Sequence, residues 1–223
     1  MPNPSQVSSQ IKGTIRFMHD QGLVQDQRAP KRKTDRGTVT VMFGGVQHMK
    51  AASRNPSYAG IYLESSRRGV YSIRMLDEAL VQLHYEFRHQ QLIRHRLAYL
   101  PHPWLGDFHL TREDFVQNNI NIDTIARGWP PTPFRFDFDR HAQRDVVHPA
   151  AHFTIGSVSQ CRIPVTRPLT PYEFIDFLLR NLYDSLANRY SAGLPKPRVA
   201  YQSTITQAES NLVHMAAPSR RAR

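Results

Sequence analysis

Residues 134–190 constrain the fold of this chain more than any other stretch, because strand and helix signals follow one another there without a break. In Phe134–Asp139, three phenylalanines alternate with an arginine and two aspartates, which is the two-residue period of a half-buried strand. A similar alternation predicts a second strand over His148–Gly156, and Cys161–Val165 predicts a short third strand whose proline confines it to a sheet edge. Thr170–Tyr190 combines a capping box with a continuous apolar stripe, so we expect an amphipathic helix that covers the sheet.

Antiparallel pairing of the first two strands would gather ionisable side chains on one face of the sheet. A histidine accepts and returns protons near neutral pH, and a neighbouring carboxylate orients its ring. Such groups beside cations suit metal-independent cleavage of RNA, in which the 2′-hydroxyl is the nucleophile. The candidate catalytic residues are Asp137, Asp139, His148 and His152. The alternative is a solvent-facing polar surface, with His148 placed in a turn by Pro149.

Metal and cofactor chemistry have little support in the sequence. His148 and His152, four residues apart on one strand, would lie about 13 Å apart and could not share an ion unless Pro149 breaks the strand. One of them with Asp137 or Asp139 could still bind a divalent cation. The helical histidine motifs of zinc proteases and di-iron proteins are absent. The single cysteine, Cys161, lies in an apolar context, and we expect it to be buried and inert. We therefore predict no metal and no cofactor.

The charge balance favours an acidic partner. Lysine and arginine number 29 against 18 acidic residues, which gives a net charge of +11, and most of the cations are arginines. Arginine forms bidentate contacts with phosphate, so we expect nucleic acid as the partner, although docking on an acidic protein would also fit. The candidate nucleic-acid-binding residues are Lys31, Arg32, Lys33, Arg94, Arg96, Arg135, Arg162 and Arg167.

The rest of the chain predicts a single α+β domain with additional segments at its N- and C-terminal ends. We expect an N-terminal helix over residues 5–27 and a basic linker to residue 36, a core over 37–194, and a basic, largely flexible tail over 195–223. The core should hold one curved antiparallel sheet of about six or seven strands, covered by the N-terminal helix and by the helix in its C-terminal half.

Further strand signals precede residue 134. We predict a strand at Thr38–Phe43 and a hairpin that joins Gly60–Glu64 to Tyr71–Met75. Residues 77–101 alternate apolar and polar side chains, which predicts two strands joined near His89. A capping box at residues 111–114 predicts a short helix to about residue 118.

Targeting signals are weak. No run reaches the roughly 20 apolar residues of a transmembrane helix, and the N-terminus lacks the charged start and apolar block of a signal peptide. With one cysteine, the chain forms no internal disulfide. We therefore expect a cytoplasmic protein with no membrane partner.

Several motifs together resemble a bacterial family described only as a domain of unknown function. They are Arg96–Pro103, Phe136-Asp137, His148–Gly156, Cys161–Pro164 and Pro168–Phe174. The resemblance spans about residues 38–190 and implies an association with anti-phage or mobile-element gene neighbourhoods. It assigns no activity to its motif positions, which are Arg96, Asp137, His148, His152, Gly156 and Arg162.

Three functions are consistent with these signals. We favour a nucleic-acid-directed accessory or binding subunit of a bacterial defence or mobile-element system. The alternatives are an effector RNase that uses the histidine and aspartate cluster, and a subunit that only binds other proteins.

Overall fold

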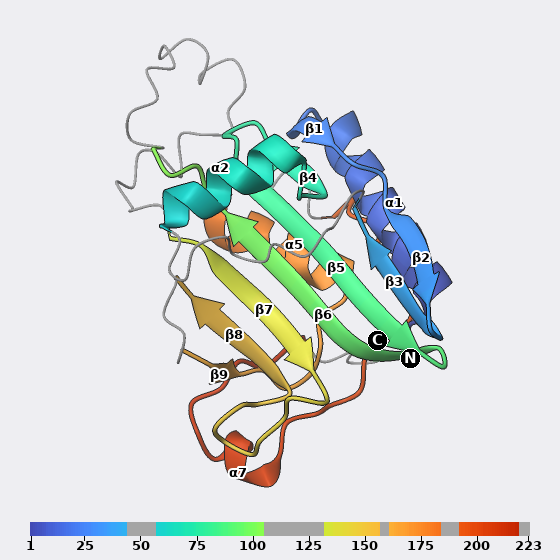
Figure 1. The fold of residues 1–223 in the computed structure, drawn as a ribbon, viewed down its shortest axis with the longest axis vertical. Helices are drawn as coiled ribbons and strands as arrows, with labels where there is room; N and C mark the ends of the chain where they lie inside the picture. The colour runs from blue at the N-terminus through green and yellow to red at the C-terminus, as the bar shows by residue number, and fades with distance from the viewer. Residues whose placement is uncertain (44–56, 105–131, 157–160, 184–191, 219–223) are drawn as a thin grey trace.

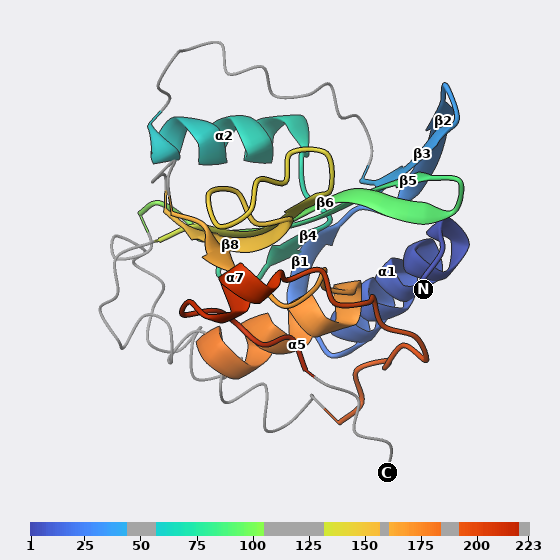
Figure 2. The ribbon, with the colours of Figure 1, turned by 90° about the horizontal axis from the view of Figure 1, so that it is seen from below.

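The computed structural model describes residues 1–43, 57–104, 132–156, 161–183 and 192–218. Within them, nine antiparallel strands form one open sheet with helices on both faces, as Figures 1 and 2 show. The α+β class with a single antiparallel sheet is therefore confirmed. The sheet has more strands than the six or seven expected, because short strands at its edges carry little periodic signal.

The elements have the following bounds. The helices are α1 (Pro4–Asp20), α2 (Tyr58–Arg68), α5 (Pro171–Leu182) and α7 (Gln207–Ser210). The strands are β1 (Val24–Gln27), β2 (Lys31–Asp35), β3 (Thr38–Met42), β4 (Ile73–Met75), β5 (Leu80–Arg88), β6 (Gln91–Leu100), β7 (Phe134–Asp139), β8 (Ala151–Ile155) and β9 (Ile163–Pro164). The main path through the sheet is β1-β4-β5-β6-β7-β8-β9, and β3 joins β2 to β5.

The hairpin of β5 and β6 forms the centre of the sheet and confirms the predicted strand pair. Its two turn residues, His89 and Gln90, have φ angles of 47° and 63°. Both angles are positive, as in the tight turns that match the twist of antiparallel strands. Strand β7 then pairs with β6 and β8 with β7, so the predicted pairing of Phe134–Asp139 with the segment after residue 148 is also confirmed.

The main core lies between one sheet face and the helices α1 and α5, which Figure 2 shows on the same side of the sheet. The phenylalanines of β7 point to this side, and the Phe136 ring contacts the rings of Phe153, Phe174 and Phe177. Helix α5 begins with the predicted capping box, in which Thr170 accepts from the Glu173 amide. The predicted continuation of this helix to Tyr190 lies outside the residues that the structure describes. The predicted helix at residues 111–118 also lies outside them.

Helix α2 covers the opposite face of the sheet and replaces a predicted hairpin (Figure 2). The prediction of a strand at Gly60–Glu64 is wrong, whereas Tyr71–Met75 does contain β4. Ser57 caps the helix and Tyr62 is buried against the sheet, while Gly69 ends the helix with a φ of 64°. The positive φ favours glycine at this position, and a Cβ there would also displace the nearby Arg28 guanidinium.

The predicted basic linker also has regular structure. Helix α1 ends at Asp20, earlier than expected, and β1 follows. Lys31–Asp35 forms β2, which pairs antiparallel with Thr38–Met42. The interpretation of residues 28–36 as a loop is therefore wrong: every residue of β2 is exposed, so the strand has no hydrophobic periodicity for sequence analysis to detect.

The predicted flexible tail, residues 195–223, is described as far as residue 218 and contacts the core at several points. Tyr201 is buried, and Met215 forms a β-bridge with Val165. The carbonyl of Pro218 accepts a hydrogen bond from Arg167 at 2.7 Å. Among the described helices, none has the length and apolarity needed to cross a membrane.

Candidate nucleic-acid interface

The sheet face opposite α1 and α5 carries the ionisable residues that the sequence singled out. Cross-strand pairing aligns Glu86, Arg94 and Asp139 in one row across β5, β6 and β7. A second row runs from His84 through Arg96 and Asp137 to His152 on β8. We call these two rows, together with Arg135, the charge ladder.

The first row is held by ion pairs. Arg94 donates to the Asp139 carboxylate through Nε at 3.0 Å and Nη2 at 2.8 Å, and it lies 3.7 Å from Glu86. Asp139 also accepts from the amides of His141 and Ala142 and so fixes the start of the segment after β7. Burial raises the pKa of Asp139, but Arg94 and these amides outweigh it, and the net shift is downward.

Asp137 is the most enclosed carboxylate of the charge ladder. Its Oδ1 accepts from Arg96 Nε at 3.0 Å and its Oδ2 from Arg135 Nε at 2.9 Å. Burial raises its pKa, and the two arginines lower it further than burial raises it. Asp137 is therefore a stable anion whose two oxygens are occupied, and the structure does not bring it together with Asp139 in a single site.

The two histidines lie much closer than the sequence predicted. His148 precedes β8, and its ring contacts that of His152 with centroids 4.9 Å apart in an edge-on arrangement. The estimate of about 13 Å is wrong because it assumed one continuous strand, whereas β8 begins only at Ala151 and His148 and Pro149 precede it. In Figure 2 the segment between β7 and β8 lies on the same side of the sheet as α2.

His152 is almost fully buried in this arrangement. Its Nδ1 lies 2.9 Å from the Pro149 carbonyl oxygen, and its Nε2 lies 3.9 Å from Asp137 Oδ2. Burial lowers its pKa, as do the charges of His148 and Arg162, while Pro149 and Asp137 act in the opposite direction. His152 is therefore mainly neutral near pH 7 and has little access to an external substrate. The described residues contain no group of three side chains that could hold a metal ion.

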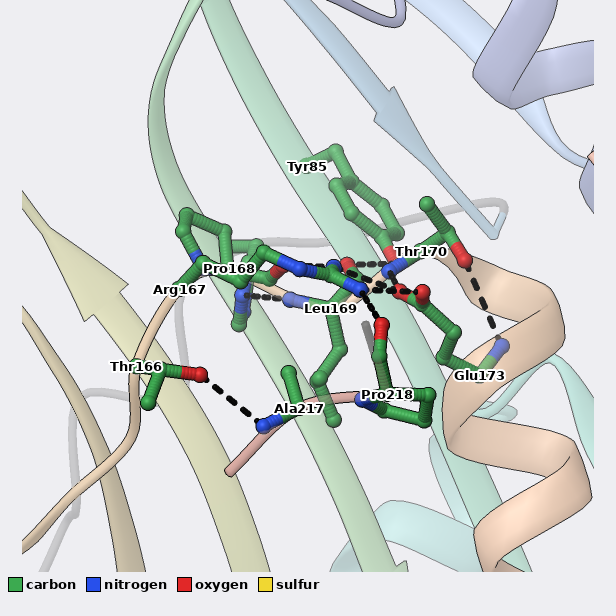
Figure 3. A network of polar contacts seen from close by, with 10 residues as sticks. Tyr85, Thr166, Arg167, Pro168, Leu169, Thr170, Glu173, Ala217 and Pro218 are labelled. Atoms are coloured by element: carbon green, nitrogen blue, oxygen red, sulfur yellow. Dashed lines mark hydrogen bonds and ion pairs between the residues drawn. The ribbon is translucent and has the colours of Figure 1, made fainter. Parts of the chain in front are cut away.

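Arg167 has a structural role in place of the predicted phosphate contact. It is 8% exposed, and Figure 3 shows its guanidinium between Glu173 and the chain end. Nη1 and Nη2 donate to the two Glu173 oxygens at 3.0 and 2.7 Å. Further bonds reach the carbonyls of Pro168 and Pro218. With both Nη atoms bonded and a side chain only 9% exposed, this arginine offers little surface to a nucleic acid.

Two further residues that the sequence analysis considered, Cys161 and Arg162, lie next to each other just before β9. Cys161 is half-buried, so the expectation of a buried thiol is wrong; it lies two residues before the short edge strand β9. Arg162 is also half-buried and close enough to His152 to influence its pKa.

Five of the exposed cations lie close together at the hairpin of β2 and β3 and at the neighbouring end of β5. They are Lys31, Arg32, Lys33, Arg36 and Arg88. Within the described parts of the chain, none of them forms an ion pair with a carboxylate. We call this group the basic hairpin. Its first three members are predicted binding residues, and Arg36 ends the predicted basic linker. Arg88 was missed because only the cross-strand pairing of Thr38 with Arg88 brings it to this hairpin.

The fold and its surfaces define an α+β protein whose open antiparallel sheet carries a charge ladder on one face and a basic hairpin at one edge. The chain belongs to the family described as "Uncharacterized conserved protein (DUF2290)", whose family model matches residues 23–217. The resemblance to a family of unknown function is thereby confirmed, while the specific motif pattern and the link to defence or mobile elements stay predictions. No curated protein and no solved structure matches the chain.

Proposed function

We propose that this protein binds nucleic acid through the basic hairpin and acts as a binding subunit. The observation that carries the proposal is the contrast between two groups of cations. Those of the basic hairpin are exposed and, in the described residues, lack a carboxylate partner. Those of the charge ladder are matched by three carboxylates, because Glu86, Asp137 and Asp139 pair with Arg94, Arg96 and Arg135.

The register of the sheet places three members of the basic hairpin on a common face. Lys33 pairs with Thr40 and Thr40 with Glu86, while Asp35 pairs with Thr38 and Thr38 with Arg88. Lys31, Lys33 and Arg88 therefore project from the same side of the sheet. Cations so placed can contact successive phosphates and release counterions, which is the sequence-independent source of nucleic-acid affinity.

Binding at the charge ladder is less favourable for an electrostatic reason. A phosphate that bound Arg96 or Arg135 would break the ion pair of that arginine with Asp137. The largely buried Asp137 carboxylate would then lack one of its two partners. That cost does not arise at Lys31 or Lys33, whose side chains are solvated. The proposal therefore keeps three of the predicted binding residues and assigns the ladder arginines to the stability of the sheet.

We expect the double variant Lys31→Gln, Lys33→Gln to bind an oligonucleotide about tenfold more weakly than the wild type. The slope of log affinity against log salt concentration should fall by about 2, because two phosphate contacts are lost. Fluorescence anisotropy with a labelled single strand at several salt concentrations measures both quantities.

The matched control is Arg67→Gln, Arg68→Gln, which removes the same charge from α2, where both arginines pair with Glu64. This control should keep nearly the wild-type affinity and slope. Equal losses from the two double variants, or a wild-type affinity that does not change with salt, would contradict the proposal.

The catalytic alternative rests on the contact between the His148 and His152 rings beside Asp137. His148 is only half-buried and is the member of the cluster that a substrate could reach. RNA cleavage by the wild type that is lost in His148→Gln and kept in His141→Gln, a change in the same segment, would favour this function over simple binding.

A further inference from the structure

A polar hollow lies between the first turns of α1 and the hairpin of β2 and β3. Its volume is about 590 Å³, within the range of small-ligand sites. It is lined by Pro4, Ser5, Ser8, Lys12, Pro30, Arg32, Thr34, Val39 and Gln90. The hollow therefore adjoins the basic hairpin but opens on the side of the sheet that faces α1.

The lining has the composition of an oxyanion site. Ser5, Ser8 and Lys12 follow one another at spacings of three and four residues, which aligns them on one stripe of α1. Arg32 faces them from β2, and its Nη1 donates to the Ser5 hydroxyl at 2.7 Å. The lining holds two cations and no carboxylate.

Side chains, rather than the free amides of the helix end, provide the donors of this hollow. Asn3 caps α1 by accepting from the Gln6 amide, and Gln6 in turn accepts from the Asn3 amide. A ligand would thus contact hydroxyl, ammonium and guanidinium groups. Such groups form charge-assisted hydrogen bonds with phosphate.

We propose that this hollow binds a phosphate monoester, and that its source is the 5′-phosphate end of a nucleic acid held by the basic hairpin. The two cations match the double negative charge of a monoester better than the single charge of an internal diester. The volume exceeds that of a phosphate group and leaves room for the attached nucleotide. Lys31 and Lys33 lie on one face of β2, and Arg32 lies on the other face. A nucleic-acid strand that crosses the edge of β2 therefore reaches both faces. This inference rests on the proposed nucleic-acid binding.

The test compares one single-stranded oligonucleotide with a 5′-phosphate and with a 5′-hydroxyl, at fixed salt. We expect the wild type to bind the 5′-phosphate form about tenfold more tightly, because one monoester with charge-assisted hydrogen bonds is gained. Lys12→Gln should abolish this preference. Arg16→Gln removes an exposed cation one turn further along α1, outside the hollow, and should keep the preference. Thermal unfolding of both variants verifies that α1 remains folded.

Competition with a nucleoside monophosphate and with inorganic phosphate separates the sources of the ligand. Loss of the 5′-phosphate preference on addition of either competitor would support the hollow as the site. Equal wild-type affinity for the two oligonucleotides would overturn the inference and leave the proposed function intact. Binding of the nucleoside monophosphate without any oligonucleotide binding would retain a monoester site but overturn its assignment to nucleic acid. Absence of binding to every probe would overturn both proposals.

Discussion

Substitution of Glu173 by alanine is expected to lower the free energy of unfolding by about 3–5 kcal/mol. Glu173 is the carboxylate partner of Arg167, and both side chains are 9% exposed. Its loss would leave a buried guanidinium with carbonyl partners only, and would also remove the acceptor for the Thr170 amide at the start of α5. Figure 3 shows that the same guanidinium binds the Pro218 carbonyl, so the contact of Pro218 with the core should loosen as well. Chemical denaturation measures the loss.

The control for this variant is another ion pair on the same helix. Asp176 accepts from Arg180 at 2.9 Å, but the Arg180 side chain is 54% exposed. Asp176→Ala should therefore cost under about 1 kcal/mol. Replacing Arg167 and Glu173 together by Met and Leu should cost less than Glu173→Ala, because no unpaired charge remains. Equal losses from Glu173→Ala and Asp176→Ala would show that burial does not strengthen the Arg167 pair.

The substitution Tyr183→Phe should cost about 2–3 kcal/mol, since it leaves a buried carboxylate without its hydroxyl donor. Tyr183 donates to Asp77 Oδ2 at 2.6 Å, and its oxygen lies 3.0 Å from that of Tyr99. These contacts tie the end of α5 to the turn before β5. Tyr172→Phe, on the same helix, is the control and should change stability by less than about 0.5 kcal/mol. Equal unfolding midpoints for the two variants would contradict the role of Tyr183.

The cost of Tyr183→Phe should depend on pH. Burial raises the pKa of Asp77 above its usual value of 3.8, so the folded protein holds this proton more tightly than the unfolded chain. The stability that Asp77 contributes is therefore complete below pH 3.8 and is lost as the pH rises through the folded pKa. The Tyr183 hydroxyl opposes this shift because it favours the charged carboxylate. The variant should lose most stability above the folded pKa and least in acid, which denaturation across a pH series measures.

The sequence predicted those elements whose signals are local. The alternation in Phe134–Asp139, the capping box at Thr170 and the turn at His89 each define their element without distant partners. Helix α2 was missed because an apparent turn at Ser65–Gly69 obscured the caps at Ser57 and Gly69. Strand β2 was missed because both of its faces are exposed, so its sequence carries no alternation of apolar and polar residues. Its strand conformation comes from its backbone pairing with β3.

For the candidate site, the sequence determined the residue types, and the tertiary structure decided which of them are available. Composition alone predicts a basic, arginine-rich chain. Arg94, Arg96 and Arg167 look alike in sequence, yet the first two pair with aspartates more than 40 residues away, and the third is buried between Glu173 and Pro218. The partners that neutralise an arginine come close to it only when the chain folds. No local sequence pattern could therefore distinguish these three paired arginines from Lys31 and Lys33.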